Sequence, residues 1–170
     1  MTLNTAIFEA FKLIQTPALT LFSKTIATIT EPLNALILAI IISAYLYYKN
    51  QKSQAILLAS TLIFTAAIIK ILKEIIRSPR PISNLILETS YSFPSGHTTF
   101  SIVFLGLLTY IFAKPKYKIP ATITSTALIA IIIFSRLYLQ VHWLTDIIGG
   151  IVIGTIILLA SILIHKHINK

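Results

Sequence analysis

Long apolar runs separated by short polar segments form the main pattern of this chain. The runs extend over residues 33–48, 53–72, 98–113, 119–135 and 144–164. A helix needs about 20 residues to cross the hydrocarbon core of a bilayer. The two shorter runs, 33–48 and 98–113, can include flanking residues or be accommodated by local thinning of the bilayer. The pattern therefore predicts an all-α fold, a multi-pass transmembrane helical bundle with about five spans.

The first 30 residues have a different pattern. Apolar side chains recur there at helical spacing, at Leu3, Ile7, Phe11 and Ile14. Because polar residues cover the other faces and Pro17 ends the stretch, we expect an amphipathic helix that lies in the membrane interface. The apolar stretch 18–29 is short and contains Lys24, so it could enter the membrane without crossing it. No basic segment precedes an A-x-A pattern here, so we expect no cleaved signal peptide.

Composition supports the membrane assignment. The 170 residues are 56% hydrophobic and only 11% charged, with a mean hydropathy of +0.87. Soluble domains carry roughly 25% charged residues. The length suits a single membrane domain over residues 1–170, made of the N-terminal segment 1–30 and a transmembrane core at 33–165. The chain has no cysteine, which excludes disulfides and thiolate metal sites.

The distribution of charge predicts a topology. The formal net charge is +9, but the cations lie in short clusters between apolar runs, which favours an anion site over a nucleic-acid-binding face. Residues 49–52, 114–118 and 165–170 carry lysines and no acid. We assign these segments to the cytoplasm by the positive-inside rule. Lysines and arginines divide equally between the two sides, so this orientation depends on reserving some outer cations for a binding site.

His142 and Asp146 form the first candidate group. They lie four residues apart at the start of an expected membrane helix, so their side chains share one helix face. A carboxylate at this depth is costly without a partner. A hydrogen bond to one imidazole nitrogen would satisfy it and leave the other nitrogen free to attack. By itself the pair could also be an interfacial helix cap, with Arg136 a snorkelling cation.

The second group is Pro94-Ser95-Gly96-His97, directly before an apolar run. Free backbone N–H groups at a helix N-terminus, beside a serine hydroxyl, can bind an anion, and Gly96 allows a close backbone approach. His97 beside such an anion is suited to protonate a leaving oxygen. An ordinary turn leading into a membrane helix is the alternative interpretation.

The third group lies in the only long polar loop, residues 73–97. Lys73 and Arg80 flank its proline-rich turn. Cations that meet a helix N-terminus suit the oxygens of a transferring phosphoryl group. A cationic surface for lipid headgroups is the alternative, which we prefer for Lys70 and Arg77. All three groups fall on the same predicted side of the membrane, and this favours one shared site.

Together the groups resemble the signature of the type 2 phosphatidic acid phosphatase (PAP2) superfamily. That signature runs K-x6-RP, PSGH and SR-x5-H-x3-D. Every position is matched here, over residues 73–146, by Lys73, Arg80-Pro81, Pro94-Ser95-Gly96-His97, Ser135-Arg136, His142 and Asp146. Bacterial membrane members of the family commonly have six spans, whereas this pattern predicts five, so the N-terminal arrangement departs from theirs.

The resemblance implies a role for each matched residue. His142 would attack phosphorus to form a phosphohistidine, Asp146 would orient it, and His97 would protonate the departing oxygen. The phosphate-binding residues would be Lys73, Arg80, Ser95, Gly96 and Arg136. The resemblance also implies a reaction without a metal or another cofactor, on a phosphorylated lipid within the bilayer.

We expect an integral protein of the cell membrane whose site faces the extracytoplasmic side. Polyprenyl (undecaprenyl-type) diphosphate is the leading substrate, with phosphatidate or phosphatidylglycerophosphate as a close alternative. Vanadium haloperoxidases have a similar site, but they are soluble and larger, and this composition argues against their chemistry. A non-catalytic lipid-binding protein is the alternative from another class, although binding alone would need only the cations.

Overall fold

The computed structural model describes residues 2–169 and is helical throughout that range apart from its connecting loops. The helices are α1 (Leu3–Leu13), α2 (Pro17–Ile29), α3 (Pro32–Tyr48), α4 (Lys52–Ile76), α5 (Gly96–Phe112), the short 3-10 helix η1 (Pro115–Tyr117), α6 (Lys118–Tyr138) and α7 (Leu144–Ile168). The expected all-α bundle of apolar helices is confirmed.

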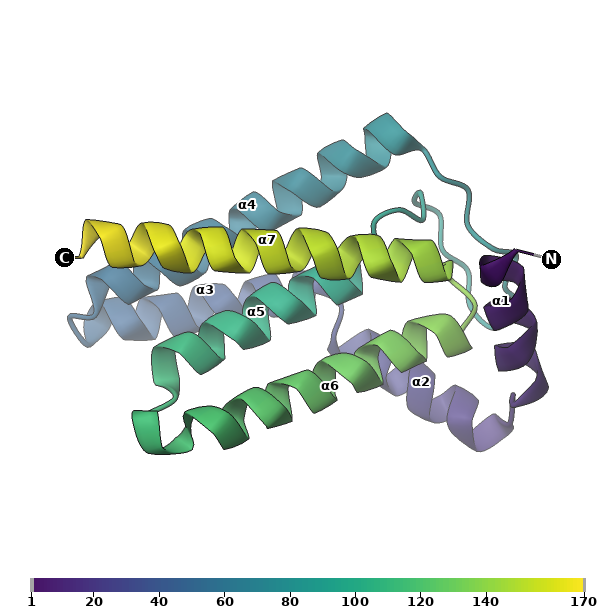
Figure 1. Ribbon diagram of the computed structural model, residues 1–170, viewed down its shortest axis with the longest axis horizontal. Coiled ribbons are helices and arrows are strands. Elements are labelled where there is room, and N and C mark those ends of the chain that lie inside the picture. The colour runs from purple at the N-terminus through teal and green to yellow at the C-terminus, as the bar shows by residue number, and fades with distance from the viewer. Residues whose placement is uncertain (1, 170) are drawn as a thin grey trace.

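The two ends of the bundle differ in character (Figure 1). The α3–α4 connection, the α5–α6 connection and the end of α7 lie together at one end. These are the lysine-rich segments assigned to the cytoplasm. The long α4–α5 loop, the α6–α7 turn and α1 lie at the opposite end. The alternation of sides expected from the sequence is therefore present in the fold.

Helix lengths give a more detailed account of the expected spans. By length and composition, Lys52–Ile76, Pro115–Tyr138 and Leu144–Ile168 can each cross a membrane, and α5 is a shorter apolar helix. Helices α2 and α3 pass the same test only together, as a pair bent by 43°. The number of five crossings stays a prediction, and the stretch 18–29 is helical and is joined to the first predicted span through a bend.

The N-terminal helices pack against the core at the loop-rich end. The expected helix near residues 3–14 is present as α1, and Phe11 packs edge-on against Phe134 with ring centroids 5.5 Å apart. Helix α2 packs along α6. There the Tyr138 hydroxyl donates to the Thr16 carbonyl (3.0 Å) and accepts from the Thr16 N–H (2.8 Å). The interfacial location of α1 and the division of the chain at residue 30 stay predictions.

Small residues let α7 approach α5 closely. A Cβ at Gly150 would lie 3.1 Å from the Ser95 carbonyl oxygen, and one at Gly154 would lie 3.1 Å from the Thr99 carbonyl oxygen. Contacts this close to backbone leave no room for a side chain, as at other tight helix crossings in membranes. The crossing brings the N-terminus of α5 beside the first turn of α7, so the first and second sequence groups meet there.

Candidate active site

The α4–α5 loop is folded back on itself beside the helix ends. Helix α4 ends at Arg77, which adopts a left-handed conformation with φ of 48°. Ser92 then ties the returning limb to the outgoing one: its N–H donates to the Ser78 carbonyl (2.9 Å) and its hydroxyl donates to the Ser78 hydroxyl (2.9 Å). This closure holds the loop residue Arg80 over the site.

His142 and Asp146 lie together, as their spacing predicts. Nδ1 of His142 is 3.4 Å from Oδ2 of Asp146, and both side chains are almost fully buried. The same Asp146 oxygen accepts the backbone N–H of Trp143 (2.8 Å), which fixes the carboxylate at the start of α7. Because 3.4 Å is longer than a normal hydrogen bond, Nδ1 is aimed at the carboxylate without completing the bond.

The other imidazole nitrogen faces a cation. Nε2 of His142 lies 3.4 Å from Nη1 of Arg80, whose guanidinium also donates to the Val141 carbonyl (2.7 Å) and the Ser90 carbonyl (2.6 Å). A guanidinium only donates, so Nε2 presents a lone pair. Burial, followed by the charges of Arg80, Arg136 and Lys73, holds the pKa of His142 well below its ordinary value of 6.5. His142 is therefore a neutral imidazole whose free nitrogen can act as a nucleophile.

Glu88 joins the two arginines of the site. Its Oε1 accepts from Nη2 of Arg136 at 2.7 Å, and its Oε2 lies 3.6 Å from Nη2 of Arg80. Burial alone would raise the pKa of Glu88, but the hydrogen bond from Arg136 and the charges of both arginines outweigh it and lower that pKa. The Glu88 carboxylate thus interacts with both guanidinium groups that the sequence assigns to phosphate.

Ser95 and Gly96 are placed at the start of α5. The Ser95 hydroxyl caps the helix, accepting from the Thr98 hydroxyl (3.0 Å), while the Ser95 N–H donates to the Asp146 carbonyl (3.1 Å). Gly96 needs no left-handed backbone, and a Cβ there would make only an ordinary 3.6 Å contact with Pro32. Phosphate binding by Ser95 and by Gly96 stays a prediction, since local geometry alone does not require glycine at this position.

His97 lies on the second residue of α5 and is 5% exposed. Its Nε2 is 3.0 Å from the Ala27 carbonyl oxygen and 3.6 Å from Oε2 of Glu31. Ala27 lies in the last turn of α2, and Glu31 directly precedes α3. The candidate acid is therefore anchored by a segment that the sequence alone places outside the core.

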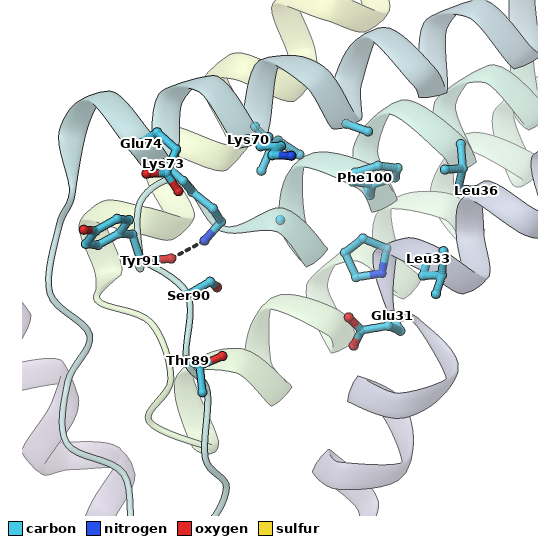
Figure 2. A pocket seen from close by; sticks show the side chains of 14 residues that line it. Glu31, Leu33, Leu36, Lys70, Lys73, Glu74, Thr89, Ser90, Tyr91 and Phe100 are labelled. Atoms are coloured by element: carbon cyan, nitrogen blue, oxygen red, sulfur yellow. Dashed lines mark hydrogen bonds between the residues drawn. The ribbon is translucent and has the colours of Figure 1, made fainter.

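A groove of about 710 Å³ leads from the site between α3, α4 and α5. Its wall includes Leu33, Leu36, Ile69 and Phe100, and its polar end carries Lys70, Lys73, Glu74 and Glu31. Figure 2 shows Lys73 reaching towards Tyr91, whose carbonyl accepts from its ammonium group, with Glu31 entering from the helix break. The groove joins an apolar wall to the charged residues of the site.

Most of the expected residues meet in one place. Lys73, Arg80, His97, Arg136, His142 and Asp146 converge from α4, the long loop and the facing ends of α5, α6 and α7. Sequence reasoning missed Glu88 and Glu31 as partners of these residues. Glu88 had one available signal, because it is the only acid of the loop segment 75–95 that also carries Arg77 and Arg80.

The acidic and histidine side chains do not group as metal ligands do. Within residues 2–169, no set of three or more His, Cys, Asp or Glu residues could hold a metal ion. The carboxylates instead pair with arginine or histidine. The expected metal-free chemistry stays a prediction for experiment.

Known proteins with similar sequences are lipid phosphatases. Phosphatidylglycerophosphatase B of Bacillus subtilis (strain 168) is 29% identical over 126 residues, which cover 71% of this chain and 62% of that protein. Undecaprenyl-diphosphatase of Sulfolobus acidocaldarius is 29% identical over 128 residues, covering 71% of this chain and 60% of the relative. The chain thus spans about three fifths of the length of these curated relatives.

The fold and a family profile agree with these relatives. The crystal structure of a transmembrane PAP2 type phosphatidylglycerolphosphate phosphatase from Bacillus subtilis superposes with a TM-score of 0.90, at 27% identity, over 97% of this chain and 85% of that one. The profile of the PAP2 superfamily matches residues 54–170, which is more than half of the chain. The protein therefore belongs to the PAP2 superfamily.

Proposed function

We propose that this protein is a membrane lipid phosphatase that passes the phosphoryl group through a phosphohistidine at His142. The observation that carries the proposal is the neutral, carboxylate-oriented imidazole of His142, held 3.4 Å from Arg80 and close enough to Lys73, which lines the groove, to be affected by its charge. A buried nucleophile beside fixed cations is the arrangement that phosphoryl transfer requires.

The proposed reaction has two steps. Nε2 of His142 attacks phosphorus while the bond to the lipid oxygen breaks and His97 supplies a proton to that oxygen. Arg80, Arg136 and Lys73 stabilise the phosphoryl oxygens, and Asp146 stabilises the positive imidazole that forms. Water then attacks phosphorus, its proton goes to His97, and the bond between His142 and phosphorus breaks to release phosphate.

The groove supplies the reason for a lipid substrate. Its apolar wall on α3, α4 and α5 can hold a hydrocarbon chain, and its charged end adjoins Lys73. A lipid within the bilayer can therefore present its phosphate to His142 without leaving the membrane. Both acyl and isoprenyl chains need only such an apolar wall, so the groove selects for a lipid chain rather than for one chain type.

Polyprenyl diphosphate is the substrate we place first. One relative of this chain, 29% identical over 128 residues, is named undecaprenyl-diphosphatase. Phosphatidylglycerophosphate is the second candidate, because the superposed crystal structure, at a TM-score of 0.90, is of a phosphatidylglycerolphosphate phosphatase. Phosphatidate is a third lipid phosphate with the same chemical group.

A substrate panel tests the proposal. Purified protein is assayed for phosphate release from polyprenyl diphosphate, phosphatidylglycerophosphate and phosphatidate, with and without a chelator. We expect release from polyprenyl diphosphate to be fastest and the chelator to change no rate. Faster release from phosphatidylglycerophosphate would replace the first substrate by the second, and a strict need for Mg²⁺ would contradict the metal-free mechanism.

The same panel separates an enzyme from a lipid-binding protein. We expect His142→Ala to lower phosphate release by at least about 1,000-fold, since removing a nucleophile eliminates the covalent route. Glu9→Gln serves as the matched control, because Glu9 is an exposed acid on α1. Lipid binding without phosphate release by the wild-type protein would support the non-catalytic alternative.

A further inference from the structure

His97 is held at the break between α2 and α3 by two oxygen atoms. One is the carbonyl oxygen of Ala27, 3.0 Å from Nε2, and the other is Oε2 of Glu31, 3.6 Å from the same nitrogen. His97 is buried, whereas the Glu31 side chain is 55% exposed. The imidazole is therefore connected to a carboxylate that reaches the open groove.

The helix break explains why the Ala27 carbonyl is available. In a continuing helix this oxygen would accept the Glu31 N–H, but that N–H donates to the Thr28 carbonyl instead (3.4 Å). Pro32 follows and has no N–H, so α2 cannot run on into α3. The break leaves a carbonyl without an intrahelical partner, and the His97 ring fills that role.

This anchoring determines where the proton of His97 lies. A carbonyl oxygen only accepts, so Nε2 must carry a hydrogen. A neutral ring then has none on Nδ1, the nitrogen that makes no hydrogen bond within residues 2–169. A ring anchored in this way can protonate a leaving oxygen from Nδ1 only as the doubly protonated imidazolium.

Glu31 is the carboxylate best placed to stabilise that imidazolium. The other charged or titratable groups that face His97 are Arg136, His142 and Glu88, from α6, the α6–α7 turn and the long loop. Burial and the cation Arg136 both oppose a second positive charge on His97, and Glu88 is bound to Arg136 at 2.7 Å. Within residues 2–169, His97 is the only ion-pair partner of Glu31.

We infer that Glu31 is a positioning residue that stabilises the imidazolium form of His97. The inference rests on the proposed function. In the first step the bond from His142 Nε2 to phosphorus forms, the bond to the lipid oxygen breaks, and the proton moves from His97 Nδ1 to that oxygen. In the second step water supplies its oxygen to phosphorus and its proton to His97 Nδ1, which restores the imidazolium beside Glu31.

The test compares two leaving groups. Phosphatidate must lose a strongly basic alkoxide, which needs a proton, whereas p-nitrophenyl phosphate loses a weakly basic phenolate, which does not. We expect Glu31→Gln to lower kcat/KM for phosphatidate by about 10- to 100-fold and kcat/KM for p-nitrophenyl phosphate by less than about threefold, because kcat/KM reports the first step and not the later attack of water. Glu31→Asp keeps the charge and should restore most of the lost rate, and Glu9→Gln should leave both rates unchanged.

A double variant shows whether Glu31 acts through His97. In the His97→Ala background, Glu31→Gln should cause no further loss on phosphatidate, because the group it stabilises is already absent. Equal losses on both substrates would indicate a merely structural role and overturn the inference, as would an unchanged rate on phosphatidate. The inference would also be overturned if the wild-type protein hydrolysed only diphosphates and p-nitrophenyl phosphate, and not phosphatidate. If the wild-type protein hydrolysed none of these substrates, the proposed function itself would be refuted.

Discussion

Burial and three neighbouring cations all lower the pKa of His142. Both disfavour the imidazolium, so the pKa lies well below 6.5 and protonation is lost as soon as the pH rises above that low value. We expect the ring to be neutral even at a pH where an ordinary histidine is half protonated, with its remaining proton on Nδ1. Nitrogen NMR of histidine-labelled protein in detergent checks this, with His142→Ala to assign the signal. A titration midpoint near 6.5 for His142 would show that burial and the cations do not lower the pKa of its ring.

Glu88 contacts both arginines that the proposed function assigns to the phosphoryl oxygens, so an incoming phosphate would compete with its carboxylate. Glu88→Gln removes this negative charge and should strengthen inhibition by orthophosphate, lowering the inhibition constant about three- to tenfold. The measurement is inhibition of lipid phosphate hydrolysis, with Glu9→Gln as the control. Weaker inhibition would mean instead that Glu88 is needed to hold Arg136 and Arg80 in position.

The sequence predicted the contact between His142 and Asp146 but not the partners of Arg136 and His97. His142 and Asp146 are four residues apart, so helical geometry alone predicts their contact. Glu88 is 48 residues from Arg136, and Ala27 is 70 residues from His97. No local pattern specifies such pairs, and the Ala27 partner is a backbone carbonyl that every residue type has.

At the level of the elements, the apolar runs predicted the helices well. The run 33–48 corresponds to α3, and the run 119–135 lies within α6. What hydropathy did not predict is the joining of α2 and α3 into one bent pair. That depends on the packing of α2 along α6 and on the chain direction across Pro32, neither of which hydropathy records.

The α5–α7 crossing should be sensitive to added volume. Gly154→Leu would place a side chain against the Thr99 carbonyl oxygen and Ile102, where an added Cβ already meets atoms at 3.1 and 3.2 Å. We expect a loss of about 1–3 kcal/mol and a midpoint of thermal unfolding several degrees lower in detergent. Thr155→Leu is the matched control because Thr155 is exposed on the same helix. Equal midpoints for the two variants would mean that the helices can separate without cost.

For the whole molecule, we expect the loop-rich end to lie outside the cell and the lysine-rich end to lie inside it. The chain has no cysteine, so single cysteines can report each side. Ile82→Cys lies in the long loop and is 88% exposed, and Gln51→Cys lies at the exposed α3–α4 connection. In spheroplasts, a membrane-impermeant maleimide should label Ile82→Cys, and label Gln51→Cys only after lysis. The reverse pattern would place the site in the cytoplasm.

The central claim is a covalent bond between phosphorus and His142, and trapping that bond tests it most directly. His97→Ala should still attack p-nitrophenyl phosphate, whose leaving group needs no proton, but should activate water poorly, so the phosphoenzyme accumulates. Rapid quenching at alkaline pH followed by mass spectrometry of the peptides should find the phosphoryl group on His142, and find none in His97→Ala/His142→Ala. Phosphate on another residue, or undiminished hydrolysis without His142, would contradict the mechanism.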